Sequence, residues 1–207
     1  MDGFNLSVLF QEVFGYKSKA FEPDLKRVPQ RAEYGKAASS PYYAVDNAGV
    51  EYFLPVELIV PSDIAATVGI SNGDGSTANR WMLPYPVLSF SLNKRFIETE
   101  LTERRGTVKE LINTGDYRIS IKGFLIGKGN DFPEDDFTTL TRIVELGVAV
   151  KINNPITDII LLRPGRAGSD EVVISSLRFP PVIGVQNVRA YELELMSDEP
   201  FNLIDIS

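Results

Sequence analysis

Two glutamates separated by a single residue are the side chains of this chain best spaced for catalysis. Glu98 and Glu100 fall in an alternating segment, so both side chains point to one face, with Cα atoms roughly 6–7 Å apart. Glycosidases use a pair of carboxylates at this kind of separation. Acidic and basic residues surround the pair, which indicates an ion-pair surface rather than a tuned acid: Arg95, Glu103, Arg104, Arg105, Lys109 and Glu110. We therefore expect no enzyme activity.

A polar, glycine-rich segment from Ser71 to Asn79 (SNGDGSTAN) is the second candidate site. Asn72, Asp74 and Ser76 alternate as calcium ligands do, but no glutamate follows at the spacing that completes a calcium loop. The segment is therefore expected to be a mobile loop, and we expect no metal and no cofactor.

Composition excludes several classes of function. The 207 residues include neither cysteine nor histidine, which removes thiol nucleophiles, cysteine-ligated zinc and histidine-based catalytic triads. The net charge of −7 argues against specific binding of nucleic acid. The first residues lack the pattern of a signal peptide, and no segment has the apolar length of a membrane span. We expect synthesis in the cytoplasm without membrane insertion.

The N-terminal segment predicts a short amphipathic helix. Asn5 can cap it, Gly15 can end it, and its apolar residues share one stripe: Leu6, Leu9, Phe10, Val13 and Phe14. The charged, proline-containing stretch from Lys17 to Pro41 has no core of its own. Residues 1–41 are therefore interpreted as a helix with an extended arm that contacts a neighbouring subunit. The alternative is a helix packed on its own domain, followed by a plain linker.

Residues 42–207 predict one α+β domain that is mainly antiparallel β, a sandwich or barrel with one packed helix. The helix is expected near Glu134–Leu146, where three acidic residues occupy the first turn and Gly147 ends it. The strands are expected at Tyr42–Val45, Val50–Val60, Val87–Glu100, Tyr117–Ile126, Val148–Ile152, Ile159–Leu162, Val172–Leu177 and Val188–Met196.

The charged stretch between the two longest predicted strands, Thr102 to Thr114, is expected to be a loop at a subunit interface. Its arginines can form bidentate pairs with carboxylates, and such pairs give a contact geometric specificity. The predicted interface residues are Arg95, Glu98, Glu100, Glu103, Arg104, Arg105, Lys109 and Glu110, together with the apolar stripe of the N-terminal helix.

The run from Leu92 to Gly127 resembles a segment of phage tail and baseplate proteins. The resemblance lies in Ile97-Glu98-Thr99-Glu100, then Gly106-Thr107-Val108-Lys109-Glu110, then Gly115-Asp116-Tyr117 and an alternating strand. A similar layout occurs in the N-terminal domain of Mu-like DNA circularisation proteins and in LysM-type baseplate proteins. The resemblance implies a tail-tube-like β domain, arranged in a homo-oligomeric ring around a tail axis, without catalysis.

These observations favour a structural component of a phage tail or related injection machine, as a ring or adaptor protein of the baseplate or tail hub. Its partners would be other tail proteins, and its location the virion. A tail tube initiator or terminator is an alternative of the same class. A glycan-binding module for host recognition, built on the aromatic first half, is an alternative of another class. A glycosidase is the fourth alternative.

Overall fold

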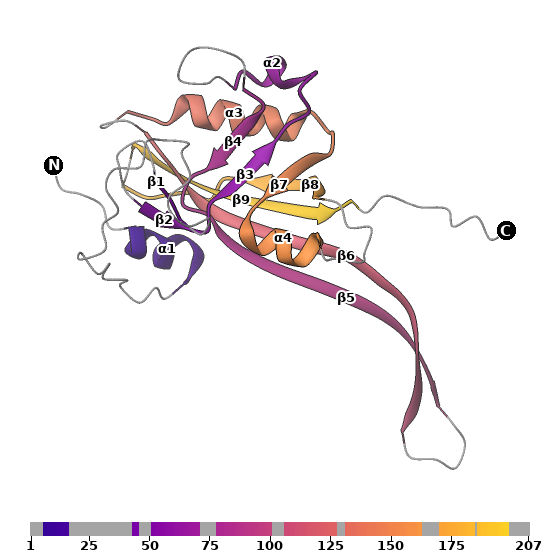
Figure 1. Ribbon diagram of the computed structural model, residues 1–207. Coiled ribbons are helices and arrows are strands. Elements are labelled where there is room, and N and C mark those ends of the chain that lie inside the picture. The colour runs from indigo at the N-terminus through magenta and orange to yellow at the C-terminus, as the bar shows by residue number, and fades with distance from the viewer. Residues whose placement is uncertain are drawn as a thin grey trace.

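A computed structural model describes residues 6–16, 43–45, 51–70, 78–100, 106–127, 131–162, 170–184 and 186–198. Its main feature is a seven-stranded antiparallel sheet with the strand order β4-β3-β7-β8-β9-β6-β5 (Figure 1). The strands of this sheet are β3 (Val56–Ile59), β4 (Arg80–Leu83), β5 (Val87–Glu100), β6 (Thr107–Ile126), β7 (Val150–Asn153), β8 (Glu171–Arg178) and β9 (Val188–Ser197). The remaining strands, β1 (Tyr43–Val45) and β2 (Glu51–Phe53), pair with each other. The predicted α+β, mainly antiparallel class is confirmed.

The main core lies between one face of the sheet and three helices. The helices are α2 (Ala65–Val68), α3 (Glu134–Glu145) and α4 (Pro155–Leu161). Leu140 and Ile143 of α3 are buried against the sheet, and Phe137 stacks on Phe179 with ring centroids 4.3 Å apart. The predicted helix is confirmed, and the acidic side chains of its first turn suit the positive end of its dipole. Helices therefore form the layer opposite the sheet.

Helix α1 (Leu6–Phe14) packs on the other face, at one end of the sheet (Figure 1). Gly15 follows it with a φ of 72°, the left-handed conformation that commonly ends a helix. Leu9 is buried against a group that includes Phe124, and the Phe10 and Phe124 rings meet edge to face at 4.7 Å. In the structure Leu9, Phe10, Val13 and Phe14 of the apolar stripe thus pack against their own chain. Residues 17–41, the predicted arm, lie outside the described residues.

Two predicted strands differ from the structure. Ile159–Leu162 was expected to be a strand, but α4 occupies Pro155–Leu161. The Asn154 side chain starts this helix by accepting a hydrogen bond from the backbone N–H of Ile156 at 2.9 Å, and Pro155 suits the first turn. The segment Val50–Val60 is two strands rather than one, because Leu54 has a φ of 54° and Pro55 follows it.

The prediction of a loop over Thr102–Thr114 is also wrong for most of its length. Strand β6 begins at Thr107 and pairs with β5 as far as Glu100. Charged residues are tolerated in this part of the ladder because both of its faces are exposed, so no side chain there must enter a core. Only the tip of the hairpin, residues 101–105, lies outside the described residues.

Candidate assembly surface

Strands β5 and β6 form a hairpin that extends beyond the rest of the sheet. We call residues 93–100 and 106–115 the outer hairpin. Strand β9 pairs with β6 only from Arg118 onward, so the outer hairpin has no third strand among the described residues. Figure 1 shows the two strands leaving the body together and projecting past α4. Eight residues of β5 at 3.3 Å each correspond to a projection of roughly 26 Å.

Large apolar side chains lie on this projection without a core to cover them. Five of them are between 43% and 54% exposed: Phe96, Ile97, Val108, Leu111 and Ile112. An isolated two-stranded hairpin is only marginally stable in water. A group of exposed apolar side chains on a projecting element is typical of a surface that another molecule covers.

The register places apolar side chains on both faces of the outer hairpin. Directly paired residues share a face, and successive residues alternate. Phe96 pairs with Leu111, so these two side chains form an apolar pair on the first face. Ile97 and Val108 lie on the second face, as diagonal neighbours in the pairs Ile97–Glu110 and Thr99–Val108.

Two bulges bend and twist the ladder where the outer hairpin begins. The pairing shifts between Leu92 and Lys94, and again between Arg95 and Phe96, where Ile112 is the extra residue of β6. Bulges increase the local twist of a strand pair and turn its side chains in a new direction. The faces of the outer hairpin are therefore rotated relative to the faces of the sheet below.

Five of the eight charged residues predicted at the interface lie together on this hairpin. Lys109 Nζ lies 3.4 Å from Glu98 Oε1, across the two strands and on the first face. Glu98 is thus part of an exposed ion pair, as its charged surroundings predicted. The other members that the structure describes are also exposed, namely Arg95, Glu100 and Glu110. Glu103, Arg104 and Arg105 lie in the tip, outside the described residues.

The apolar residues of the outer hairpin were missed by the sequence analysis, which interpreted this stretch by its charges alone. A signal was present in the run TVKELINT, from Thr107 to Thr114. Its apolar residues, Val108, Leu111 and Ile112, occupy both even and odd positions, so in a regular strand they would point to both faces. That distribution does not fit a strand with one buried and one solvent-exposed face, and it fits a strand that is exposed on both faces.

The base of the hairpin is fixed in the core by a buried tyrosine. Tyr191 of β9 pairs with Gly123 of β6, and its hydroxyl donates a hydrogen bond to the Pro84 carbonyl at 2.9 Å. A Cβ on Gly123 would come within 2.4 Å of that hydroxyl oxygen. Glycine is therefore required here for close packing, and the contact ties β6 to the turn that precedes β5.

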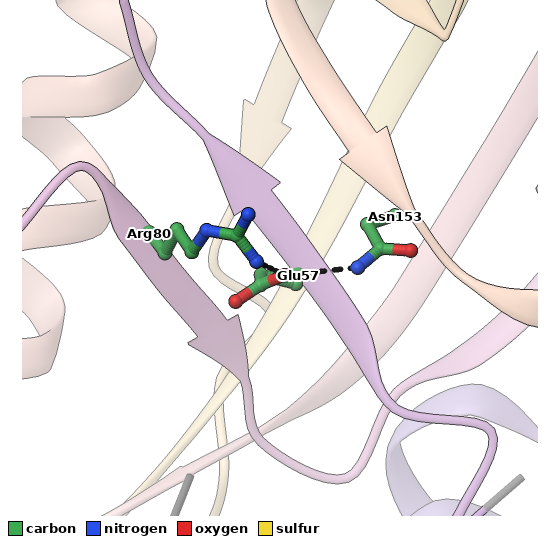
Figure 2. Close-up of polar contacts among 3 residues, drawn as sticks. All are labelled: Glu57, Arg80 and Asn153. Atoms are coloured by element: carbon green, nitrogen blue, oxygen red, sulfur yellow. Dashed lines mark hydrogen bonds and ion pairs between the residues drawn. The ribbon is translucent and has the colours of Figure 1, made fainter. Parts of the chain in front are cut away.

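The face of the sheet that carries α1 is polar over much of its remaining area. Figure 2 shows Glu57 of β3 between Arg80 of β4 and Asn153 of β7. The distances to Glu57 Oε2 are 3.2 Å from Arg80 Nη1 and 3.0 Å from Asn153 Nδ2. Such cross-strand pairs stabilise the sheet and leave its surface charge-balanced.

Lys122 of β6 lies on the same face. Its ammonium lies 2.9 Å from Glu192 Oε1, and the hydrogen bond to Glu192 raises the pKa of Lys122 above its ordinary value. The same ammonium lies 5.4 Å from the centroid of the Phe14 ring and 5.7 Å from that of Tyr16. These contacts connect the end of α1 to the sheet.

Within the residues that the structure describes, no cluster of acidic side chains is arranged to hold a metal ion. The candidate calcium ligands Asn72, Asp74 and Ser76 lie outside those residues. None of the described helices has the length and apolar character needed to cross a membrane.

Comparison with known proteins gives one family and distant structural matches. Residues 81–206 match the family described as "Domain of unknown function (DUF6046)". Among solved structures, the chain is similar to one from the tail of an empty GTA particle with C6 symmetry, at 17% identity and a TM-score of 0.37. That match covers 61% of this chain and 87% of the other. A search of curated proteins found no match. The family match includes the whole of β5 and β6.

Proposed function

The chain belongs to the family described as a domain of unknown function (DUF6046), and we propose that it is a structural subunit of a phage tail or related injection machine. In this proposal it is a ring or adaptor protein of the baseplate or tail hub, without enzyme activity. The observation that carries the assembly role is the outer hairpin, with apolar side chains exposed on both faces of a projecting element. The sequence resemblance over Leu92–Gly127 supports its place in a tail.

The outer hairpin adds little to the stability of the isolated chain. Apolar surface in water is unfavourable by about 25 cal/mol per Å² relative to burial. These side chains contribute little to the folded core, because none of the five belongs to either core group of described residues. A subunit that buries their remaining exposed surface on assembly gains this free energy at the interface.

A shortened variant tests the proposal directly. Leu92 and Tyr117 are directly paired, so residues 93–116 can be replaced by Asn-Gly, which closes a two-residue hairpin turn. The variant should fold, because the inner strands and both core groups are retained. It should be absent from tail particles assembled in host cells, whereas the unaltered chain should be present. The measurements are circular dichroism with thermal melting for the fold, and mass spectrometry of purified particles for incorporation.

The same variant separates the proposal from the glycan-binding alternative. A host-recognition module should bind cell-wall or surface glycans as a purified protein, with or without the outer hairpin if its aromatic first half carries the site. Normal incorporation of the shortened variant into particles would contradict the role that we propose for the hairpin. Glycan binding by a chain that is found in no particle would favour the alternative.

A further inference from the structure

We propose that residues 199–207 continue β9 along the open edge of β6 and turn the outer hairpin into a three-stranded sheet. This third strand forms within the single chain, whatever the chain assembles with. In the described residues the last direct pair between β6 and β9 is Arg118 with Met196, whereas β6 itself extends from Thr107. The edge of β6 along the outer hairpin is therefore the place where a continued β9 would lie.

Backbone groups of β6 point to this open edge. At the base of the hairpin the Tyr117 N–H points to the β9 side, where the Ser197 hydroxyl accepts its hydrogen bond at 3.0 Å. The two bulges each add one residue to β6, so together they restore the alternation, and the N–H groups of Leu111 and Lys109 point to the same side. An open strand edge is a template for pairing, and a third strand gives a marginal hairpin independent stability.

The end of β9 has the backbone orientation that this pairing needs. The Asp198 N–H donates to the Glu171 carbonyl of β8 at 2.9 Å, so it points away from β6. Successive N–H groups alternate across a strand, so the odd-numbered residues that follow would turn theirs toward β6. Pro200 has no N–H, and it falls on the side that faces away from β6, where the edge strand of a sheet tolerates proline.

The register of the continued strand follows from the last observed pair. Met196 lies opposite Arg118, and β6 uses two more residues than a regular strand over the bulged stretch. Counting past these two residues puts Phe201 opposite Leu111. At 3.3 Å per residue, residues 199–207 span roughly 30 Å, which is enough to reach the far end of the described part of the hairpin.

The apolar side chains of this segment would then lie on both faces, as those of the hairpin do. Phe201 would extend the pair of Phe96 and Leu111 on the first face, and Ile204 would lie opposite Val108 on the second. Apolar side chains that face each other across strands stabilise a sheet. The third strand would therefore widen both faces and keep their apolar character.

The family match gives an independent reason to treat this segment as part of the domain. The described residues end at Asp198, whereas the match extends from residue 81 to residue 206. The sequence pattern of the family thus continues beyond β9, through most of the proposed strand.

Proline substitutions in the full-length chain test the third strand by the direction of the lost N–H group. Leu203→Pro removes an N–H that would face β6, whereas Asn202→Pro removes one that would face away. The amide hydrogens of Leu111 and Lys109 should exchange at least about tenfold faster in Leu203→Pro than in the unaltered chain, because their hydrogen-bond partners are displaced. Asn202→Pro should leave this exchange unchanged. NMR-detected hydrogen exchange gives the measurement.

Two controls separate the lost N–H from other effects. Leu203→Ala keeps the N–H and removes most of the side chain, so it should retain most of the protection. The amide of Ile121, in the inner region, should exchange equally slowly in every variant, because the core is not altered. Equal acceleration by both proline variants, or none by Leu203→Pro, would contradict the third strand.

The absence of cysteine allows the strand to be located by a disulfide. In the proposed register Val108 and Ile204 are directly opposed without mutual hydrogen bonds, and their Cα atoms, about 4.5 Å apart, suit a disulfide. Val108→Cys with Ile204→Cys should form an intramolecular disulfide under mild oxidation. The matched control is Thr99→Cys with Ile204→Cys, because Thr99 shares the face but lies on β5, beyond β6. This control should stay reduced.

Non-reducing electrophoresis and peptide mapping distinguish the outcomes. Equally fast disulfide formation in the control would show that the segment is not held beside β6. A disulfide-linked dimer in place of the intramolecular bond would show that a second copy supplies the strand. Either result overturns the inference.

The third strand and the proposed function can fail separately. A chain that shows the protection and the disulfide but is found in no tail particle retains the third strand without the proposed role. A chain that is incorporated into tail particles but shows neither retains the proposed role alone.

Discussion

Strands β5 and β6 run as one ladder through two regions of different character. In the inner region, Val87–Leu92 pairs with Tyr117–Lys122, and β9 continues the sheet on the far side of β6. There Ile119 and Ile121 are completely buried. In the outer hairpin the same backbone pairing continues, yet Ile97 is half exposed. The hydrogen-bonded ladder is therefore shared, and the third strand and the helical layer distinguish the folded core from the exposed outer hairpin.

The comparison predicts a large difference in stability for the same substitution at two positions. Ile121→Ala should lower the free energy of unfolding by about 2–5 kcal/mol, because it leaves a cavity under a fully buried side chain. Ile97→Ala should change it by less than about 0.5 kcal/mol, since the side chain is half exposed and lies outside the core. Urea unfolding of the monomeric chain, at a constant m-value, measures both.

Equal losses for the two variants would show that the outer hairpin has a core of its own in solution. For incorporation into particles the Ile97 variant should have a direct effect, because Ile97 lies on a face that we propose to be covered. Incorporation should be reduced by Ile97→Ala, and Ile121→Ala should act only through the amount of folded protein.

Two glycines of β6 give a second contrast between the regions. An alanine Cβ at Gly123 would meet the Tyr191 hydroxyl oxygen at 2.4 Å and the Pro84 carbonyl oxygen at 2.8 Å. An alanine Cβ at Gly115 would meet the Asn93 carbonyl oxygen at 3.1 Å, next to a bulge that can relax. Gly123→Ala should cost about 1–3 kcal/mol through overpacking, and Gly115→Ala less than about 1 kcal/mol. Chemical denaturation again provides the measurement.

The Gly123 effect can be assigned to its cause with a double-mutant cycle. Tyr191→Phe alone removes the hydrogen bond to Pro84 and should cost about 1 kcal/mol. Combined with Gly123→Ala, it also removes the nearest clashing atom. The double variant should therefore lose less unfolding free energy than the sum of the two single losses. Strict additivity would show that the strain arises elsewhere.

The sequence was sufficient for elements with a clear local pattern. Helix α3 has acidic residues in its first turn and Gly147 after its end, and the inner part of β5 alternates cleanly. It was insufficient for α4, because the apolar run Ile159–Leu162 fits a buried strand as well as a buried helix. The Asn154 cap resolves that ambiguity, and its side chain also donates to the carbonyl of Pro55, which is distant in sequence.

The candidate surface was predicted only in part for a similar reason. The charged residues of the outer hairpin were identified, but Thr107–Thr114 was expected to be a loop. Its strand conformation depends on pairing with β5 and not on burial, so the one-sided alternation that identifies strands is missing there. The contribution of Phe96 and Leu111 became evident only when the register placed them side by side.

The smallest contrast concerns two ion pairs on the same strand. Lys122 and Glu192 are 2.9 Å apart, with side chains 25% and 17% exposed, whereas Lys109 and Glu98 are 3.4 Å apart and 61% and 56% exposed. A methionine keeps the apolar stem of a lysine and removes its charge. Lys122→Met should lower the free energy of unfolding by about 0.5–1 kcal/mol, and Lys109→Met by about 0–0.5 kcal/mol, because water screens the outer pair.

The pH dependence gives the inner pair a separate signature. Because the hydrogen bond to Glu192 raises the pKa of Lys122 in the folded protein, the folded state holds this proton more tightly than the unfolded state. The contribution of Lys122 is therefore fully present below its ordinary pKa of 10.5 and is lost as pH rises through the higher folded-state value. The stability difference between the unaltered chain and Lys122→Met should be constant from pH 7 to about 10 and should shrink above that range. A difference that instead grows at alkaline pH would mean that Lys122 binds its proton less tightly in the folded state than in the unfolded state. Glu192 would then not be the main determinant of the Lys122 pKa.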